Sequence, residues 1–307
     1  MSFDLGSVGA ISVISLDFMV PIALTAVGEI FAEKAGVVNI GLEGIMLTSA
    51  WGAIFVTWLA ANPYAGLLGG TLVGVGFGAL HAVLSVNLKG DQIISGVGIN
   101  LFAIGFVPFA TFAIWHVSGV FPPVSFAFGK IVEIATPWAP LSYFVPISIV
   151  VAIAFWYVLN RTRWGYQVRA TGENPEAADA VGIDVEKTRI LAVLVGSALA
   201  GLAGAYLSVD VVGQITKDIS AGRGFIALAT VVFAGWNPLI GLGGALVFGY
   251  SQGAATWFAG VPEVRNAIPH ADYLLSAIPY IATLVVVAVA IGKSRAPKAV
   301  GTPYNRE

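Results

Sequence analysis

The side chains of this sequence that could do chemistry are polar residues set within or beside long apolar runs. A charge at the centre of a bilayer costs about 2.5–3.5 kcal/mol on insertion scales, so such residues tend to face a cavity or a partner. Glu43 fits this argument best, because apolar residues extend well to either side of it. The full set is Asp17, Glu29, Asn39, Glu43, His81, Asn100 and Asp210.

Asn39, Glu43 and Asn100 are the residues that we predict to line a path for a solute. An Asn side chain both donates and accepts hydrogen bonds, as a hydroxyl-rich solute requires. Taken singly, each Asn is more typical of a hydrogen bond between helices. Both interpretations stay open at this point.

The other ionisable residues have plainer interpretations. Glu29 and Glu33, near the end of the first apolar run, suit interface charges at least as well as a buried role. Asp17 and Asp210 are expected near the outer surface, where the cost of a charge is small. His81 is more typical of a packed histidine with satisfied hydrogen bonds than of a ligand contact.

Composition excludes several functions. The chain has no cysteine, so thiol catalysis, disulfides and zinc–thiolate sites are ruled out. The three histidines are far apart, and a net charge of −2 offers no basic face to nucleic acid. Gly292-Lys293-Ser294 resembles the end of a phosphate-binding loop, but Val287 stands where the first glycine is required. We predict no catalytic residue, no metal site and no cofactor.

The same composition places the chain in a membrane. Hydrophobic residues make up 57% of it and charged residues 10%, whereas a soluble domain carries about a quarter charged residues. A spanning helix needs roughly 20 mostly apolar residues. The prediction is an all-α, polytopic transmembrane helical bundle, with residues 1–307 as a single transmembrane domain. Nine candidate segments cover residues 10–31, 37–61, 66–88, 93–115, 143–159, 190–212, 225–236, 239–258 and 277–292.

The seventh of these segments is too short to cross the membrane alone. Trp236-Asn237-Pro238 separates it from the eighth, because proline cannot continue a helix. A short or re-entrant helix is tolerated at this depth only where protein buries its ends.

A weak internal repeat is also visible: Ala35-Gly36 and Ala221-Gly222 each open a glycine-rich, interrupted segment.

Basic residues predict the orientation, because lysine and arginine mark cytoplasmic loops. Residues 160–189 and the tail after residue 292 are the two basic regions, and an even number of crossings must separate them if both are inside. This places Lys34, Lys89 and the C-terminus in the cytoplasm and the N-terminus outside. Lys130, Lys217, Arg223 and Arg265 fall outside this pattern.

Small residues recur at every fourth position in three of the predicted helices. This spacing lets helix backbones approach closely in lipid, so we interpret the stripes as packing surfaces. They are Gly66, Gly70, Gly74 and Gly78, then Ala192, Gly196, Ala200 and Gly204, and finally Gly241, Ala245, Gly249 and Gly253.

Residues 160–189, which we call the charged loop, hold five basic and five acidic residues. Asn174 is a good N-cap, Pro175 a good first helical residue, and Gly182 a good C-terminal stop. They predict a helix of about two turns, and Asp184 caps the helix that follows. Ala177, Ala178 and Val181 form its small apolar face.

A plain solvated connector would need only a few turn residues. Thirty residues of balanced charge around a capped helix favour a docking element for a soluble partner, with the connector as the alternative. The candidate coupling residues are Arg169, Gly172, Asn174, Pro175, Glu176, Ala177, Ala178, Asp179 and Gly182.

Three stretches resemble one transporter family. The run from Arg169 to Asp184 resembles the coupling loop of ABC importer permeases, in the branch for branched-chain amino acids, ribose and nucleosides. The run from Gly28 to Met46 resembles the signature of the simple-sugar or general nucleoside permease subgroup. A third match covers Gly222 to Pro238, and together the three lie between about residues 28 and 258.

The resemblance implies a permease subunit that translocates a nucleoside or simple sugar by alternating access. It is not an enzyme, since ATP hydrolysis would come from partner ABC ATPases on the charged loop. The other implied partners are a second permease, identical or longer, and an extracytoplasmic solute-binding protein. That protein would dock on the outer loop 116–142, whose composition equally suits a plain rigid loop.

A second interpretation is a proton-coupled secondary transporter that uses Glu43 or Glu29. The charged loop argues against it, because a secondary transporter needs no ATPase dock. An intramembrane enzyme is a distant third, since no nucleophile–base spacing supports it.

Overall fold

The computed structural model describes residues 5–118, 120, 131, 133–262, 264, 274–275, 277–290 and 295–305. Six helices in these ranges are long and apolar enough to cross a membrane, which confirms the all-α membrane architecture. The longer helices are α1 (Leu5–Lys34), α2 (Leu42–Ala60), α3 (Pro63–Ala82), α4 (Gln92–Trp115), α6 (Phe144–Arg161), α9 (Val185–Tyr206), α11 (Pro238–Ala259) and α14 (Ile278–Ala290). The shorter ones are α7 (Arg163–Glu173), α8 (Pro175–Ala180) and α10 (Arg223–Phe233).

Each of the nine predicted segments corresponds to a helix, and the short seventh segment is α10. One π-helical turn extends α3 (η1, Val83–Asn87) and another extends α9 (η2, Leu207–Val211). The predicted start of the second segment was wrong, because residues 37–41 are not helical and α2 begins at Leu42. The backbone N–H groups of Val38, Asn39 and Gly41 donate to side-chain oxygens instead of to helix carbonyls.

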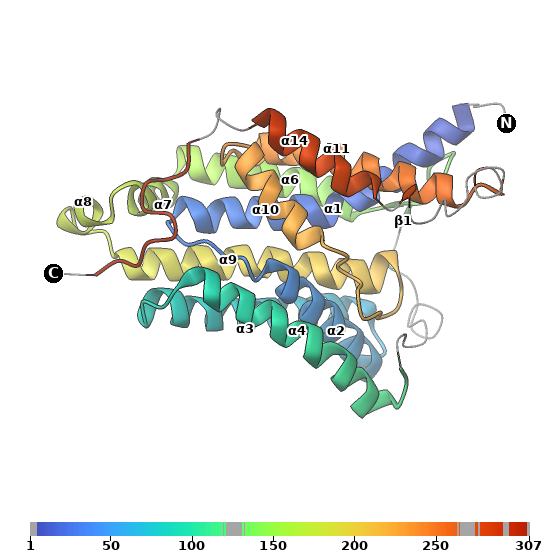
Figure 1. Ribbon diagram of the computed structural model, residues 1–307, viewed down its shortest axis with the longest axis horizontal. Coiled ribbons are helices and arrows are strands. Elements are labelled where there is room, and N and C mark those ends of the chain that lie inside the picture. The colour runs from blue at the N-terminus through green and yellow to red at the C-terminus, as the bar shows by residue number, and fades with distance from the viewer. Residues whose placement is uncertain are drawn as a thin grey trace.

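Helices α1 and α9 run through the middle of the bundle, with α2, α3 and α4 on one side and α6, α10, α11 and α14 on the other (Figure 1). A Cβ atom placed on Gly28 of α1 would lie 2.7 Å from the Gly196 carbonyl oxygen of α9. A Cβ on Gly74 of α3 would meet the Cα of Gly201 at 2.6 Å. Such approaches confirm that the stripes of small residues are packing surfaces.

A short antiparallel hairpin joins the outer region to the core. Strands β1 (Glu133–Ile134) and β2 (Leu141–Ser142) pair in the register Glu133 to Ser142. The Ser142 backbone N–H donates to Asp17 at 3.2 Å, and its hydroxyl donates to Asp210 at 2.5 Å. Both carboxylates are partly exposed, as expected for positions near a surface.

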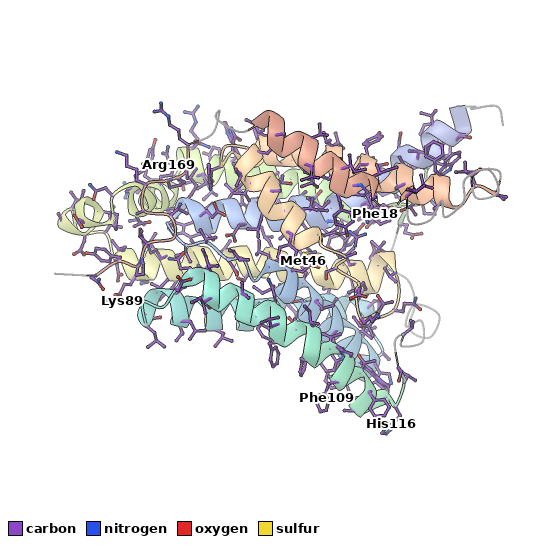
Figure 2. All side chains as sticks on the ribbon, viewed as in Figure 1. Phe18, Met46, Lys89, Phe109, His116 and Arg169 are labelled. Carbon is purple, nitrogen blue, oxygen red and sulfur yellow. The ribbon has the colours of Figure 1, made fainter. Side chains whose placement is uncertain are left out.

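Residues predicted to be cytoplasmic lie together at one end of the bundle. Lys89 and Arg169 lie at the end that carries α8, and His116 lies at the opposite end (Figure 2). The C-terminal tail also reaches the α8 end (Figure 1). Lys130, Arg265, the Gly292-Lys293-Ser294 motif and most of the outer loop between residues 119 and 132 lie outside the described residues.

Candidate functional site

The break between α1 and α2 is held by side chains from three helices. Gly36 takes a left-handed φ of 98°, which turns the chain out of α1. The Asn39 backbone N–H then donates to Glu29 Oε1 at 2.7 Å, and the Asn39 side chain accepts from the Gly41 N–H at 2.9 Å. The amide of Asn39 also donates to the Ser197 hydroxyl on α9 at 3.5 Å.

Asn100 on α4 fixes the start of α2. Its Oδ1 accepts from the Gly44 backbone N–H at 2.7 Å, and its Nδ2 donates to the Ile40 carbonyl at 2.9 Å. One side chain therefore satisfies a free helix N–H and a loop carbonyl. The first turn of α2 lies in the protein interior, so its free backbone groups are bonded by Asn100 in place of water.

The second break lies before α10 and meets the first one. Ala221 and Gly222 both have left-handed φ values, 45° and 77°, and α10 starts at Arg223. Glu43 Oε1 accepts from the Gly222 N–H at 2.8 Å, and Oε2 accepts from the Gly224 N–H at 2.7 Å. We call this contact between the starts of α2 and α10, formed by residues 39–44 and 221–224, the junction.

The electrostatics of the junction are favourable. A carboxylate stabilises the positive end of a helix, and charge-assisted bonds to backbone N–H groups are among the strong hydrogen bonds. Gly224 is required at this point, because a Cβ there would lie 2.5 Å from the Glu43 backbone nitrogen. The two glycine-rich interruptions that suggested a repeat are thus joined through Glu43.

Arg223 is a buried charge at the junction, only 6% exposed, and sequence reasoning missed its role. Its Nη1 donates to the carbonyls of Ile219 and Ser220 at 3.1 and 3.2 Å, and its guanidinium lies 5.4 Å from the centre of the Phe18 ring. The available signal was a lone arginine that did not fit the cytoplasmic pattern and opened a short apolar helix.

Asn39, Glu43 and Asn100, predicted from sequence to line a solute path, come together at the junction. Each of the three binds backbone groups, so the role of joining segments that we had kept open for the asparagines is confirmed. Their contact with a solute stays a prediction. Asn39 is 1% exposed and Asn100 8%, while Glu43 is partly exposed.

Three further buried residues that the sequence singled out, Glu29, Glu33 and His81, also form hydrogen bonds. Glu29 and Glu33 are 1% and 5% exposed, so their interpretation as interface charges was wrong. Glu33 accepts from the indole N–H of Trp236 at 2.5 Å, in the break between α10 and α11. His81 binds the Ser95 hydroxyl and the Val38 carbonyl, both at 3.0 Å, which confirms a packed, satisfied histidine.

The charged loop contains the predicted short helix. Asn174 caps α8 by accepting from the Ala177 N–H at 3.0 Å, Pro175 is the first residue, and Glu176 lies in the first turn. Gly182 has a φ of 86°, and Asp184 caps α9 through the Lys187 N–H at 2.9 Å. Helix α7, which precedes α8, was not predicted. Thr162 caps it, and Trp164, Val168 and Thr171 mark one of its faces.

The predicted apolar face of α8 is divided. Ala178 is 3% exposed, while Val181 is 78% exposed and Ala177 is also exposed. A single face made of all three was therefore wrong, because α8 packs through Ala178 on α7 and α9. Asp179 is partly buried, and Arg169 lies over the Tyr166 ring at 4.7 Å.

Arg189 is 1% exposed and lies where the charged loop meets the rest of the protein. We call this region, formed by residues 171–172 and Arg189, the base of the charged loop, and Arg189 joins it to two other segments. Its guanidinium donates to the carbonyls of Ala35 at 3.1 Å, Thr171 at 3.4 Å and Thr302 at 2.9 Å. These carbonyls belong to the end of α1, the end of α7 and the C-terminal tail. Sequence reasoning had used Arg189 only as a marker of orientation.

The C-terminal tail adds two backbone bonds to the same base. Ala299 donates to the Gly172 carbonyl at 2.9 Å, and Gly301 donates to the Gly36 carbonyl at 3.2 Å. Gly172 is required here, because a Cβ would lie 2.2 Å from the Lys34 carbonyl oxygen. The base is thus built on close backbone contacts, while the tip of α8 stays exposed.

Within the described ranges, no three His, Cys, Asp or Glu side chains are grouped so as to hold a metal ion. The site consists of helix starts, amides and two buried arginines. Together with the Glu43 carboxylate, these groups bind polar backbone atoms and join segments that are distant in the sequence.

Comparison with known proteins finds relatives along most of the chain. Residues 12–289 match the family model described as the permease component of a branched-chain amino acid transport system. The nucleoside ABC transporter permease protein NupC of Lactococcus lactis is 34% identical, over 94% of each chain. The guanosine ABC transporter permease protein NupQ of Bacillus subtilis is 35% identical, also over 94% of each chain. A putative glucose ABC transporter permease protein, TsgC13 of Haloferax volcanii, is 32% identical over 100% of this chain and 99% of its own.

Proposed function

Because the chain belongs to the family of permease components of branched-chain amino acid transport systems, we propose that it is the membrane permease subunit of an ABC importer for nucleosides or simple sugars. The observation that carries this is identity of 32–35% along almost the whole length to ABC permeases named for nucleosides, guanosine and glucose. It is a multi-pass membrane protein, and its whole length would act as one permease domain.

The charged loop is the proposed contact for a partner ATPase. It presents α8 and, directly after it, Val181, which is 78% exposed, on a base that Arg189 fixes to α1 and to the tail. An exposed apolar residue on a rigid support is suited to docking in a groove of a soluble protein. This end, with the C-terminus, would face the cytoplasm, in keeping with its lysines and arginines.

Solute would cross near the junction, with alternating access driven by ATP binding to the partners. Two helix starts that meet inside a membrane protein are typical of a transporter's central site. A second permease would complete the pathway, and an extracytoplasmic solute-binding protein would deliver cargo at the opposite end. Asn39, Glu43 and Asn100 are the proposed polar frame of that path.

The experiment is uptake into proteoliposomes that hold the purified complex, ATPases and solute-binding protein included. Uptake of adenosine, guanosine or ribose should require ATP and should continue after the proton gradient is removed. Uptake that needs the gradient and ignores ATP would favour the secondary transporter. The structure gives Glu43 little part in that alternative, since both of its oxygens already accept backbone N–H groups.

A further inference from the structure

A cavity of about 310 Å³ lies beside the junction, between α10, α11 and α14. Its floor is apolar and buried, made by Ile226, Ala255 and Pro279. Its rim is polar and accessible, made by Gln252, Thr256 and Tyr280. An apolar floor with a few convergent polar groups is the usual form of a small-molecule site, and the volume is at the lower end of the usual range.

The rim groups on α11 are free to bind a ligand. Neither the Gln252 amide nor the Thr256 hydroxyl has a hydrogen-bond partner among the described residues. Their neighbours do: the Ser251 hydroxyl donates to the Phe248 carbonyl at 2.7 Å, within its own helix. Gln252 and Thr256 are four positions apart, so they lie one above the other on the same face of α11.

Tyr280 forms the aromatic wall of the cavity, and its ring is held in place. Its hydroxyl donates to the Ala221 carbonyl at 3.3 Å, although the side chain is 52% exposed. Ala221 itself has a φ of 45°, a conformation that costs energy for a residue other than glycine. Strain of this kind is concentrated at functional sites, and here it lies next to Gly222, which binds Glu43.

We infer that this cavity receives the base of a nucleoside. A primary amide offers an NH2 donor group and a carbonyl acceptor in one plane, which matches the edge of a nucleobase. A tyrosine ring gives a stacking surface that tolerates any base. A free pentose has hydroxyl groups around its ring and gains less from the floor of Ile226, Ala255 and Pro279. The inference rests on the proposed import function and narrows it to nucleosides.

The first test measures uptake by the reconstituted complex. Q252L removes the free amide, and T256V removes the free hydroxyl at similar size. The matched control is T283V on α14, whose hydroxyl is already bonded to the Pro279 carbonyl at 2.8 Å. The KM for adenosine and uridine should rise about three- to tenfold in Q252L, the range expected for one or two neutral hydrogen bonds. T283V should match the parent.

The second test measures whether a solute occupies the cavity, and it does not depend on transport. The chain has no cysteine, so T256C introduces a single thiol at the rim and T283C a matched control. In the assembled complex, adenosine and uridine should each slow maleimide labelling of T256C, while ribose at the same concentration should not. Neither solute class should change the labelling of T283C.

The outcomes separate the two proposals. Protection of T256C by ribose as well, or by neither class, overturns the nucleobase site. Import of nucleosides with an unchanged KM in Q252L and T256V overturns the site but leaves the import function standing. A parent complex that imports sugars alone also overturns the site. A parent complex that imports neither class contradicts the proposed function itself.

Discussion

The junction and the base of the charged loop solve the same electrostatic problem with opposite charges. At the junction, the Glu43 carboxylate binds N–H groups at the start of α10, where the helix end is positive. At the base, the Arg189 guanidinium binds carbonyls at the ends of α1 and α7, where the helix ends are negative. In each place one charged side chain replaces the water that free helix ends would otherwise need.

The two regions differ in what they leave exposed. The junction encloses its polar groups: Asn39 and Asn100 are 1% and 8% exposed. The charged loop buries Arg189 at its base and exposes Val181 at its tip. Residues 35–41 connect the two, with Ala35 bound by Arg189 and Asn39 bound by Glu29. We therefore expect the tip to matter for coupling, and Glu43 and Arg189 to matter for folding as well.

The largest effect should come from removing the tip. Replacement of residues 174–181 by a flexible polar linker, with Gly172 and Gly182 kept, should abolish ATP-driven uptake. The change leaves the Gly172–Ala299 and Arg189–Thr302 bonds in place, so membrane insertion should be normal. Uptake by proteoliposomes and thermal unfolding in detergent are the two measurements. Normal uptake would contradict the docking role.

Arg189→Met should have the next largest effect, through stability. It leaves three carbonyls without their charged donor, and hydrogen bonds to charged groups contribute about 1.5–3 kcal/mol each. A loss of about 3 kcal/mol or more in the free energy of unfolding is expected, seen as a lower Tm in detergent. Arg163→Met, at an exposed position of α7, is the matched control and should stay near the parent. Equal stability of the two variants would refute the view of Arg189 as a structural centre.

These two variants also mark what the sequence can and cannot predict. The signals for α8 are local: Asn174, Pro175, Gly182 and Asp184 lie within one short stretch, and each has the predicted role. The separation of α10 from α11 was predicted for the same reason, from Trp236-Asn237-Pro238, although α10 covers Arg223–Phe233 and not the predicted residues 225–236. Helix α7 was missed because its apolar residues are few among charges, although their spacing is helical.

The pairing of distant segments could not be predicted in this way. Glu43 and Gly222 are 179 positions apart, and Arg189 and Ala35 are 154 apart. A buried charge indicates that a partner exists, but many backbone groups could supply it. Sequence therefore singled out Asn39, Glu43 and Asn100 as unusual without revealing that they bind helix starts and loop backbone.

The Glu43→Gln substitution tests the junction, as Arg189→Met tests the base of the charged loop. Glutamine has one acceptor oxygen, so one of the Gly222 and Gly224 N–H groups would face an amide donor. We expect a loss of about 1.5–3 kcal/mol in stability and a clear fall in uptake. Glu133→Gln, exposed on β1, is the control. Loss of a proton-dependent current alone, with ATP-driven uptake intact, would instead favour proton coupling.

The smallest expected effect belongs to the cap of α8. Asn174→Ala removes the acceptor for the Ala177 N–H, and loss of such a cap costs about 1 kcal/mol. Because α8 is short and packs on α7 and α9 mainly through Ala178, this cost should fray α8 locally and leave the global Tm within a few degrees of the parent. Uptake should nevertheless fall severalfold, since a frayed helix docks poorly. Asn174→Asp, which keeps an N-cap oxygen, should restore it. If Asn174→Ala lowers the Tm as much as Arg189→Met does, the exposed tip and the buried base are one cooperative unit, and the contrast drawn between them is wrong.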